Sequence, residues 1–180
     1  SAKISGVKHG VSEYWADVKK LVTGDTVVSR KVPYISTAEP NPVKPYVAEF
    51  FKNGKLQREK IKNHPSYQYG FLREEIQEHI LDKLQLLIEQ RIIKGTFENG
   101  MEYTIIGVIL NLNKEVLRMV QKFDFTKKNP KFLYISTTEE MMTLEDSILV
   151  SFLNLAGFDV LFLVLTGYQS IEKFFTRKLM

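Results

Sequence analysis

The stretch Lys131-Phe-Leu-Tyr-Ile-Ser136 is a short apolar run, and Asp159-Val-Leu-Phe-Leu-Val-Leu165 is a second one. Between them, Leu144 to Leu155 places apolar residues at helical spacing, and Gly157 follows as a helix-ending residue. A strand that is covered on both faces is apolar along nearly its whole length. Two such strands joined through a helix are typical of a right-handed parallel βαβ unit. The sequence therefore predicts adjacent parallel strands at 131–136 and 160–165, bridged by a helix over 144–155.

Two long helices are predicted before this unit. Over Phe71–Lys94, apolar residues recur three or four positions apart, and Gly95 follows as a C-cap. A similar stripe predicts a helix over Glu102–Phe123, and a strand over Tyr103–Leu110 is the alternative because β-branched residues are frequent there. The sustained heptad spacing favours the helix, and the short turn at Asn99-Gly100 predicts an antiparallel helical hairpin. The residues expected in its core are Ile76, Ile80, Leu84, Leu87, Ile105, Ile109, Leu112, Val116 and Met119.

The first third of the chain looks irregular. Ser12 to Val22 predicts one amphipathic helix with Ser12 as its N-cap. Thr26 to Ser36 has the composition of a strand, which Pro33 restricts to an edge strand or an extended arm. Ser1-Ala2 has the look of a tag remnant and is left out of the predicted fold.

These patterns predict an α/β fold with a small parallel sheet, a βαβ unit at the C-terminal end, and helix-rich N-terminal two-thirds. We expect residues 1–66 to form an irregular N-terminal segment with one helix and an extended arm. We expect residues 67–180 to form one domain, in which the helical hairpin packs with the βαβα unit.

Composition restricts the classes of function. The chain has 180 residues, of which 44% are hydrophobic, enough for one core. The absence of cysteine excludes disulfides, thiolate metal ligands and cysteine nucleophiles, and it fits a cytoplasmic protein. The net charge of +4 comes from Lys and Arg scattered along the chain rather than from a basic cluster, so we expect no nucleic-acid partner.

Metal binding and membrane insertion are also not expected. The three histidines, His9, His64 and His79, have no ligand spacing, and His79 is expected to be solvated because polar residues surround it in sequence. The most apolar window, Ile148–Leu165, contains Asp159 near its centre, where a charge would cost about 2.5–3.5 kcal/mol in a membrane. We therefore expect no membrane span.

Polar residues follow both predicted strands of the βαβ unit, and ligands of open α/β sheets bind beyond the carboxyl ends of strands. The candidate ligand-binding residues are Ser136, Thr137, Thr138, Thr166, Gly167 and Tyr168. Thr143 is also interpreted as an ordinary N-cap whose helix carries Asp146 in its first turn, which weakens an anion site there. Gly167 as a plain turn and Tyr168 as a wall residue remain open alternatives. Asp159 lies at the amino end of its strand and is interpreted as a turn or cap residue.

Four motifs carry a family resemblance: Gln121-Lys-Phe-Asp-Phe-Thr126, Asn129-Pro-Lys-Phe-Leu-Tyr-Ile135, Thr143-Leu-Glu-Asp146 and Gly157-Phe-Asp-Val-Leu-Phe-Leu-Val-Leu-Thr-Gly-Tyr168. The chain resembles the bacterial YceG-like family, which is encoded alongside tellurium-resistance and stress-response proteins. The resemblance is strongest from about Tyr103 to Phe175, and Leu165 replaces a proline of the family pattern. Family members are usually longer, so the resemblance implies a fragment. It also implies a component of a biosynthetic module in an oxyanion and stress response, without assigning catalytic residues.

Two functions are compatible with these features. In the first, the protein binds a nucleotide or nucleoside-like metabolite through the six residues at the strand carboxyl ends. In the second, it is a non-catalytic scaffold whose helical hairpin docks a protein partner of the same stress-response system. The sequence specifies neither a reaction nor a cofactor.

Overall fold

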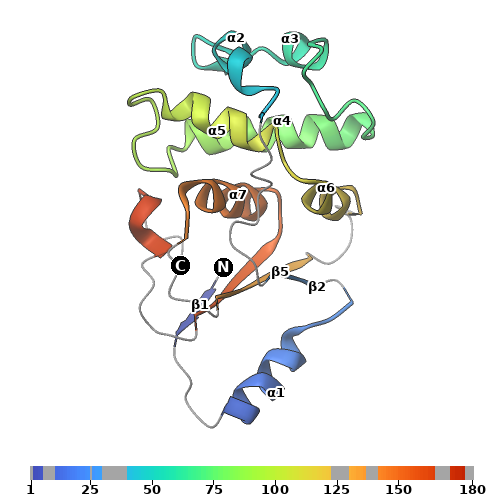
Figure 1. Ribbon diagram of the computed structural model, residues 1–180, viewed down its shortest axis with the longest axis vertical. Coiled ribbons are helices and arrows are strands. Elements are labelled where there is room, and N and C mark those ends of the chain that lie inside the picture. Colours follow the sequence, from blue (N-terminus) through green and yellow to red (C-terminus); the bar gives the residue numbers. More distant parts are fainter. Residues whose placement is uncertain are drawn as a thin grey trace.

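A parallel sheet forms one layer of the molecule, and most of the helices form a second layer on one of its faces (Figure 1). The computed structural model describes residues 2–5, 11–24, 26–29, 40–122, 130–136, 142–164 and 171–176. Within these ranges the sheet has four strands in the order β1-β6-β5-β2, and every neighbouring pair is parallel. The strands are β1 (Ala2–Ser5), β2 (Thr26–Ser29), β5 (Lys131–Ser136) and β6 (Asp159–Val164).

The predicted βαβ unit is confirmed. Strands β5 and β6 pair in parallel from Lys131 opposite Asp159 to Ser136 opposite Val164, and α7 (Leu144–Leu155) connects them. The four central residues of β5, Phe132 to Ile135, are each at most 3% exposed, as expected for a strand covered on both faces. Strand β6 begins one residue earlier than predicted, and Leu165 lies outside the described residues.

Different helices cover the two faces of the sheet. Phe132, Tyr134, Val160 and Phe162 belong to the large core that also contains α7 and the helical layer. Leu133, Ile135 and Leu163 form a smaller core with Val18 of α1 (Val11–Leu21). The alternation of residues along each strand separates these two sets. Helix α1 already includes Ser12, so the prediction of Ser12 as its N-cap is wrong.

The helical layer contains the residues of the predicted helical hairpin together with several shorter elements. It comprises η1 (Lys44–Tyr46), α2 (Val47–Phe50), the hairpin β3 (Phe51–Lys52) and β4 (Lys55–Leu56), α3 (Arg58–Lys62), α4 (Glu74–Glu89), α5 (Met101–Ile109), α6 (Lys114–Gln121) and η2 (Ile171–Phe174). All nine residues expected in the hairpin core are buried. Helix α4 is shorter than the predicted Phe71–Lys94, because Arg73 is extended at one end and Arg91 is left-handed at the other.

The single helix predicted over Glu102–Phe123 is wrong, because the chain breaks between α5 and α6. Tyr69 is fully buried, its hydroxyl donates to the Ile109 oxygen (2.6 Å), and it accepts from the Leu112 nitrogen (2.8 Å). In a continuous helix both backbone groups would be bonded within the helix. Asn113 then caps α6, since its side chain accepts from the Val116 nitrogen. Phe123 lies outside the described residues.

Parts of the N-terminal third contribute regular structure that the sequence did not predict. Ala2, set aside as a remnant, begins β1, which pairs with β6 from the other end of the chain. Strand β2 is an edge strand, as expected for the start of 26–36, and residues 30–36 lie outside the described part. In the described ranges, no helix combines the length and the apolar character that a membrane crossing requires.

Candidate functional site

Three strands end level with one another at the carboxyl edge of the sheet. Val164, the last residue of β6, is the register partner of Ser136 in β5 and of Ser5 in β1. Of the six predicted ligand residues, Ser136 lies at this edge as the last residue of β5, and only its backbone is described. The other five residues, Thr137, Thr138, Thr166, Gly167 and Tyr168, lie outside the described residues.

The neighbouring strands β1 and β6 send the chain to opposite faces of the sheet. After β1 the chain continues to α1, which packs with Val18 against one face. After β6 it reaches η2, which packs against α7 on the other face. There the Lys94 nitrogen donates to the Phe174 oxygen (2.8 Å), and the Thr176 nitrogen donates to the Ile92 oxygen (2.9 Å). Such a reversal is the topological switch point at which open α/β sheets bind ligands.

The amino end of α7 is an ordinary capped helix start. The Thr143 hydroxyl accepts a hydrogen bond from the Asp146 nitrogen (3.1 Å), which confirms Thr143 as the N-cap. Ser147 donates from its hydroxyl to the Thr143 oxygen (2.9 Å). Glu145 brings negative charge to the first turn, next to the buried acidic residue Asp146. This charge complements the helix dipole and disfavours a bound anion at this helix end.

His79 is half-buried between α4 and α7, so the prediction that it is solvated is wrong. Its Nε2 atom lies 3.2 Å from the carbonyl oxygen of Ala156, just beyond the end of α7. Because a carbonyl can only accept, Nε2 carries the proton in this contact. Burial lowers the pKa of His79 below its ordinary value of 6.5, and the Ala156 contact opposes this shift.

We expect the stability of the protein to decrease as the pH falls below 6.5, because of His79. Above that pH the side chain is neutral in the folded and the unfolded chain. Below it the unfolded chain takes up the proton first, because the pKa of His79 is lower in the folded state. His79→Gln keeps a donor for Ala156 but does not titrate, so it should reduce the difference between urea midpoints at about pH 7.5 and about pH 5.5. An equal pH dependence in both proteins would contradict this role.

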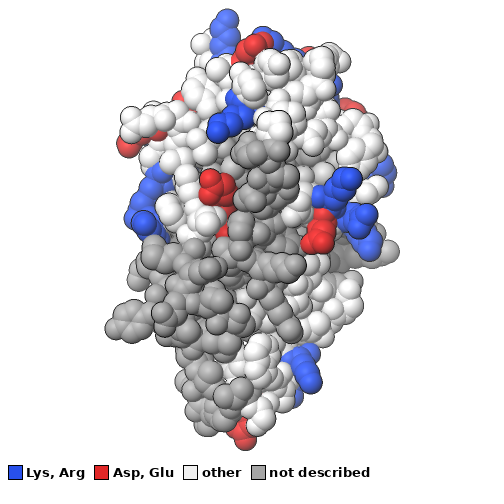
Figure 2. All heavy atoms as spheres, viewed as in Figure 1, with Lys and Arg blue, Asp and Glu red and all other residues white. Residues whose placement is uncertain are grey.

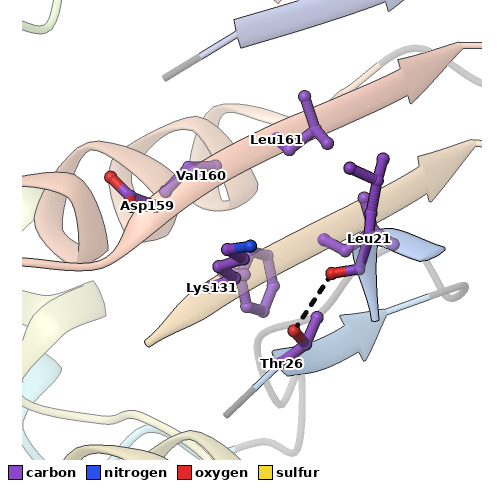
Figure 3. Close-up of a pocket in the computed structure, with 8 residues that line it drawn as sticks. Leu21, Thr26, Lys131, Asp159, Val160 and Leu161 are labelled. Carbon is purple, nitrogen blue, oxygen red and sulfur yellow. Dashed lines mark hydrogen bonds between the residues drawn. The ribbon is translucent and has the colours of Figure 1, made fainter. Parts of the chain in front are cut away.

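A pocket of about 270 Å³ lies at the opposite, amino edge of the sheet (Figure 3). It forms where α1 ends at Leu21, because the helix does not extend over the first residues of β5 and β6. The Thr26 hydroxyl at its side donates to the Leu21 oxygen (3.4 Å). The residues that line it are Leu21, Thr26, Lys131, Phe132, Leu133, Asp159, Val160 and Leu161.

The sequence interpretation of Asp159 as a turn or cap residue missed this pocket. Asp159 is the first residue of β6, is exposed, and is the register partner of Lys131, the first residue of β5. Side chains two positions apart share a face of a strand. Lys131, Leu133, Asp159 and Leu161 are therefore on the face that α1 covers. The available signal was an opposite charge at the start of each of two apolar runs.

Some of the charged side chains of the helical layer form ion pairs with one another. In Figure 2, acidic and basic side chains are interspersed over the described part of this layer. Arg58 of α3 contacts Glu78 (2.7 Å) and Asp82 (2.6 Å) of α4, and Lys62 contacts Glu78 as well. These ion pairs attach α3 to α4, which indicates a structural role for these four side chains.

Comparison with known proteins places this architecture in a family. The model of the YceG domain matches residues 1–180. The chain is also 25% identical over 178 residues to the "Uncharacterized protein YceG" of Bacillus subtilis (strain 168), covering 96% of this chain and 33% of that protein. The chain thus spans about a third of the length of this curated relative. No solved structure matches the chain. The match over all of its residues shows that the chain belongs to the YceG domain family.

Proposed function

We propose that this YceG domain binds a nucleotide or nucleoside-like metabolite at the carboxyl edge of its parallel sheet, as part of a bacterial tellurite-resistance and stress response. The observation that carries the proposal is the switch point between β1 and β6, where Ser5, Val164 and Ser136 end level with one another. At such a position the connections diverge to opposite faces, and the space between them is where α/β proteins bind nucleotides.

The residues that follow these strand ends have the chemistry of a nucleotide site. Thr137, Thr138 and Thr166 offer hydroxyl groups for a phosphate or a ribose. Gly167 would permit a close approach of the ligand to the backbone, and Tyr168 would offer a ring on which a base can stack. The start of α7 is capped and acidic, so it disfavours an anion. Residues 166–168 are therefore the more favourable position for an anionic group of the ligand.

A thermal-shift screen tests the ligand class directly. The purified protein is heated with nucleotides, nucleosides, sugar nucleotides and inorganic oxyanions, including tellurite. A ligand that binds only the folded state raises the melting temperature, by an amount that grows with its concentration above Kd. The proposal expects a stabilising nucleotide or nucleoside, whereas a response limited to inorganic oxyanions would contradict the nucleoside part of it.

Substitutions in the 166–168 loop test the position of the site. Tyr168→Ala would remove a stacking surface worth roughly 1–3 kcal/mol, and Gly167→Val would obstruct the approach of the ligand. Both variants should retain a near-normal melting temperature and lose binding of the ligand found in the screen. In cells whose tellurite protection depends on this protein, both should reduce that protection.

Two matched controls come from a loop of the helical layer. A Cβ added at Gly70 meets no atom within 4 Å, so Gly70→Val should preserve ligand binding. Phe71 is 67% exposed, so Phe71→Ala removes an aromatic ring outside the proposed site without opening the core. If the loop variants bind and protect as well as these controls, the 166–168 loop is only a turn and the proposed site is wrong.

The alternative, a scaffold that docks a protein partner through the helical hairpin, has less support. The stripe residues Ile76, Ile80, Leu84 and Leu87 are fully buried, since α4 packs against α5 and α7. The apolar surface that would serve a partner is therefore used inside the helical layer. Retained tellurite protection in both loop variants would nevertheless favour the scaffold.

A further inference from the structure

We infer that the pocket at the amino edge of the sheet is a second binding site, for a small zwitterion with an apolar side chain, such as an apolar amino acid. This site is independent of the nucleotide site proposed above, because it lies at the opposite edge of the sheet. The strand register brings its residues together. Lys131 lies opposite Asp159 on the neighbouring strand, and Leu133 lies opposite Leu161 two residues further along.

The pocket combines an apolar floor with two opposite charges at its rim. Leu133 and Leu161 line the pocket from the sheet. In Figure 3, Leu21 lies at the end of α1 beside them, and the exposed Lys131 and Asp159 begin their strands. Leu161 is only partly buried, although its register partner Leu133 is 2% exposed. A ligand with an apolar side chain would therefore cover apolar surface of Leu161 that the fold leaves accessible to solvent.

The two charges suit a ligand that carries both signs close together. Neighbouring strands are about 4.8 Å apart, so the two side chains start from adjacent points on the same face. Both side chains are exposed, and no ion pair among the described residues involves Lys131 or Asp159. In an α-amino acid the carboxylate and the ammonium group share one carbon atom, so they can face Lys131 and Asp159 while the side chain enters the pocket.

The volume limits the size of the ligand. Pockets for drug-sized ligands measure about 300–1,000 Å³, so about 270 Å³ fits a molecule of the size of leucine or phenylalanine. A purely anionic ligand would meet the carboxylate of Asp159, and a purely cationic one would meet the ammonium group of Lys131. The pair therefore selects zwitterions over both.

Titration of the ¹⁵N-labelled protein with leucine and phenylalanine, followed by amide chemical shifts, tests this inference. Shifts should change at residues 131–133 and 159–161 with either ligand. Three analogues should each bind at least about tenfold more weakly than leucine. They are glycine, which has no side chain, N-acetyl-leucine, which has no cation, and leucinamide, which has no anion. Unchanged shifts at about 10 mM leucine and phenylalanine would overturn the inference, because this concentration detects a Kd of roughly 1 mM.

Charge-removing variants separate this site from the nucleotide site. Lys131→Met and Asp159→Asn should each weaken leucine binding by about tenfold, while the exposed Lys52 of β3 supplies the control Lys52→Met, which should leave it unchanged. A melting temperature close to that of the parent protein shows that each variant is folded. Leucine binding that is equally strong in all three variants would contradict the assignment of the charges. Gly167→Val should not affect leucine binding, so each of the two sites can fail without the other.

Discussion

Replacing Tyr69 by phenylalanine is expected to lower the free energy of unfolding by about 2–6 kcal/mol. The hydroxyl of Tyr69 satisfies two backbone groups at the break between α5 and α6, namely the Ile109 oxygen and the Leu112 nitrogen. All three residues are at most 5% exposed, so water has little access to replace the hydroxyl. A buried donor and a buried acceptor left without a partner each cost about 1–3 kcal/mol.

Tyr67→Phe is the matched control for this variant. The Tyr67 hydroxyl donates to the side-chain oxygen of Gln77 (2.9 Å), and Tyr67 is only partly buried. Its loss should cost about 0.5–1.5 kcal/mol, the usual value for one hydrogen bond. Urea denaturation of both variants measures the difference. Equal unfolding free energies for Tyr69→Phe and Tyr67→Phe would show that the hydroxyl of Tyr69 does not stabilise the break.

Replacing Leu84 by alanine is expected to cost about 2–5 kcal/mol, because it leaves a cavity in the largest core. Leu84 is fully buried in α4, and this helix packs against both α5 and α7. A loss of this size is a large part of the about 5–15 kcal/mol that stabilises a typical domain. The midpoint of chemical denaturation should therefore move to clearly lower denaturant concentration.

Leu86→Ala, two residues further along the same helix, removes the same atoms from a partly exposed position. Both variants replace leucine by alanine within α4, so the change in helix propensity is the same in each. The difference between their unfolding free energies therefore isolates the contribution of burial. We expect Leu86→Ala to cost less than half as much as Leu84→Ala. Similar midpoints for the two variants would show that the Leu84 stripe is not the core of the helical layer.

The sequence by itself determined the βαβ unit, because the signals for this unit are local. Continuous apolar runs at 131–136 and 159–165 identified two strands, and the helical spacing of residues 144–155 identified the helix between them. The order strand, helix, strand is enough to predict parallel pairing, since a crossover of this length leads back in the same direction. The stripe of α4 and its burial were predicted for the same reason.

The break between α5 and α6 was decided by tertiary structure. The heptad spacing continues through Leu112 and Val116, and both residues are buried, so the pattern alone indicates one helix. The break depends on the hydroxyl of Tyr69, which is distant in sequence and competes with the hydrogen bonds of the helix. A pattern that reports only which residues face the core cannot detect such a competitor.

Pairing between distant segments was also decided only by tertiary structure. Four residues at Ala2–Ser5 carry little strand signal, and they form β1 because β6 offers them unpaired backbone groups. The same contact makes β6 a neighbour of β1 at the carboxyl edge, an arrangement that the sequence did not predict. The burial of His79 against Ala156 likewise depends on how α4 packs against α7. The pocket at Lys131 and Asp159 exists because α1 ends at Leu21 over the sheet. Periodicity describes one element at a time, whereas these features depend on where two elements meet.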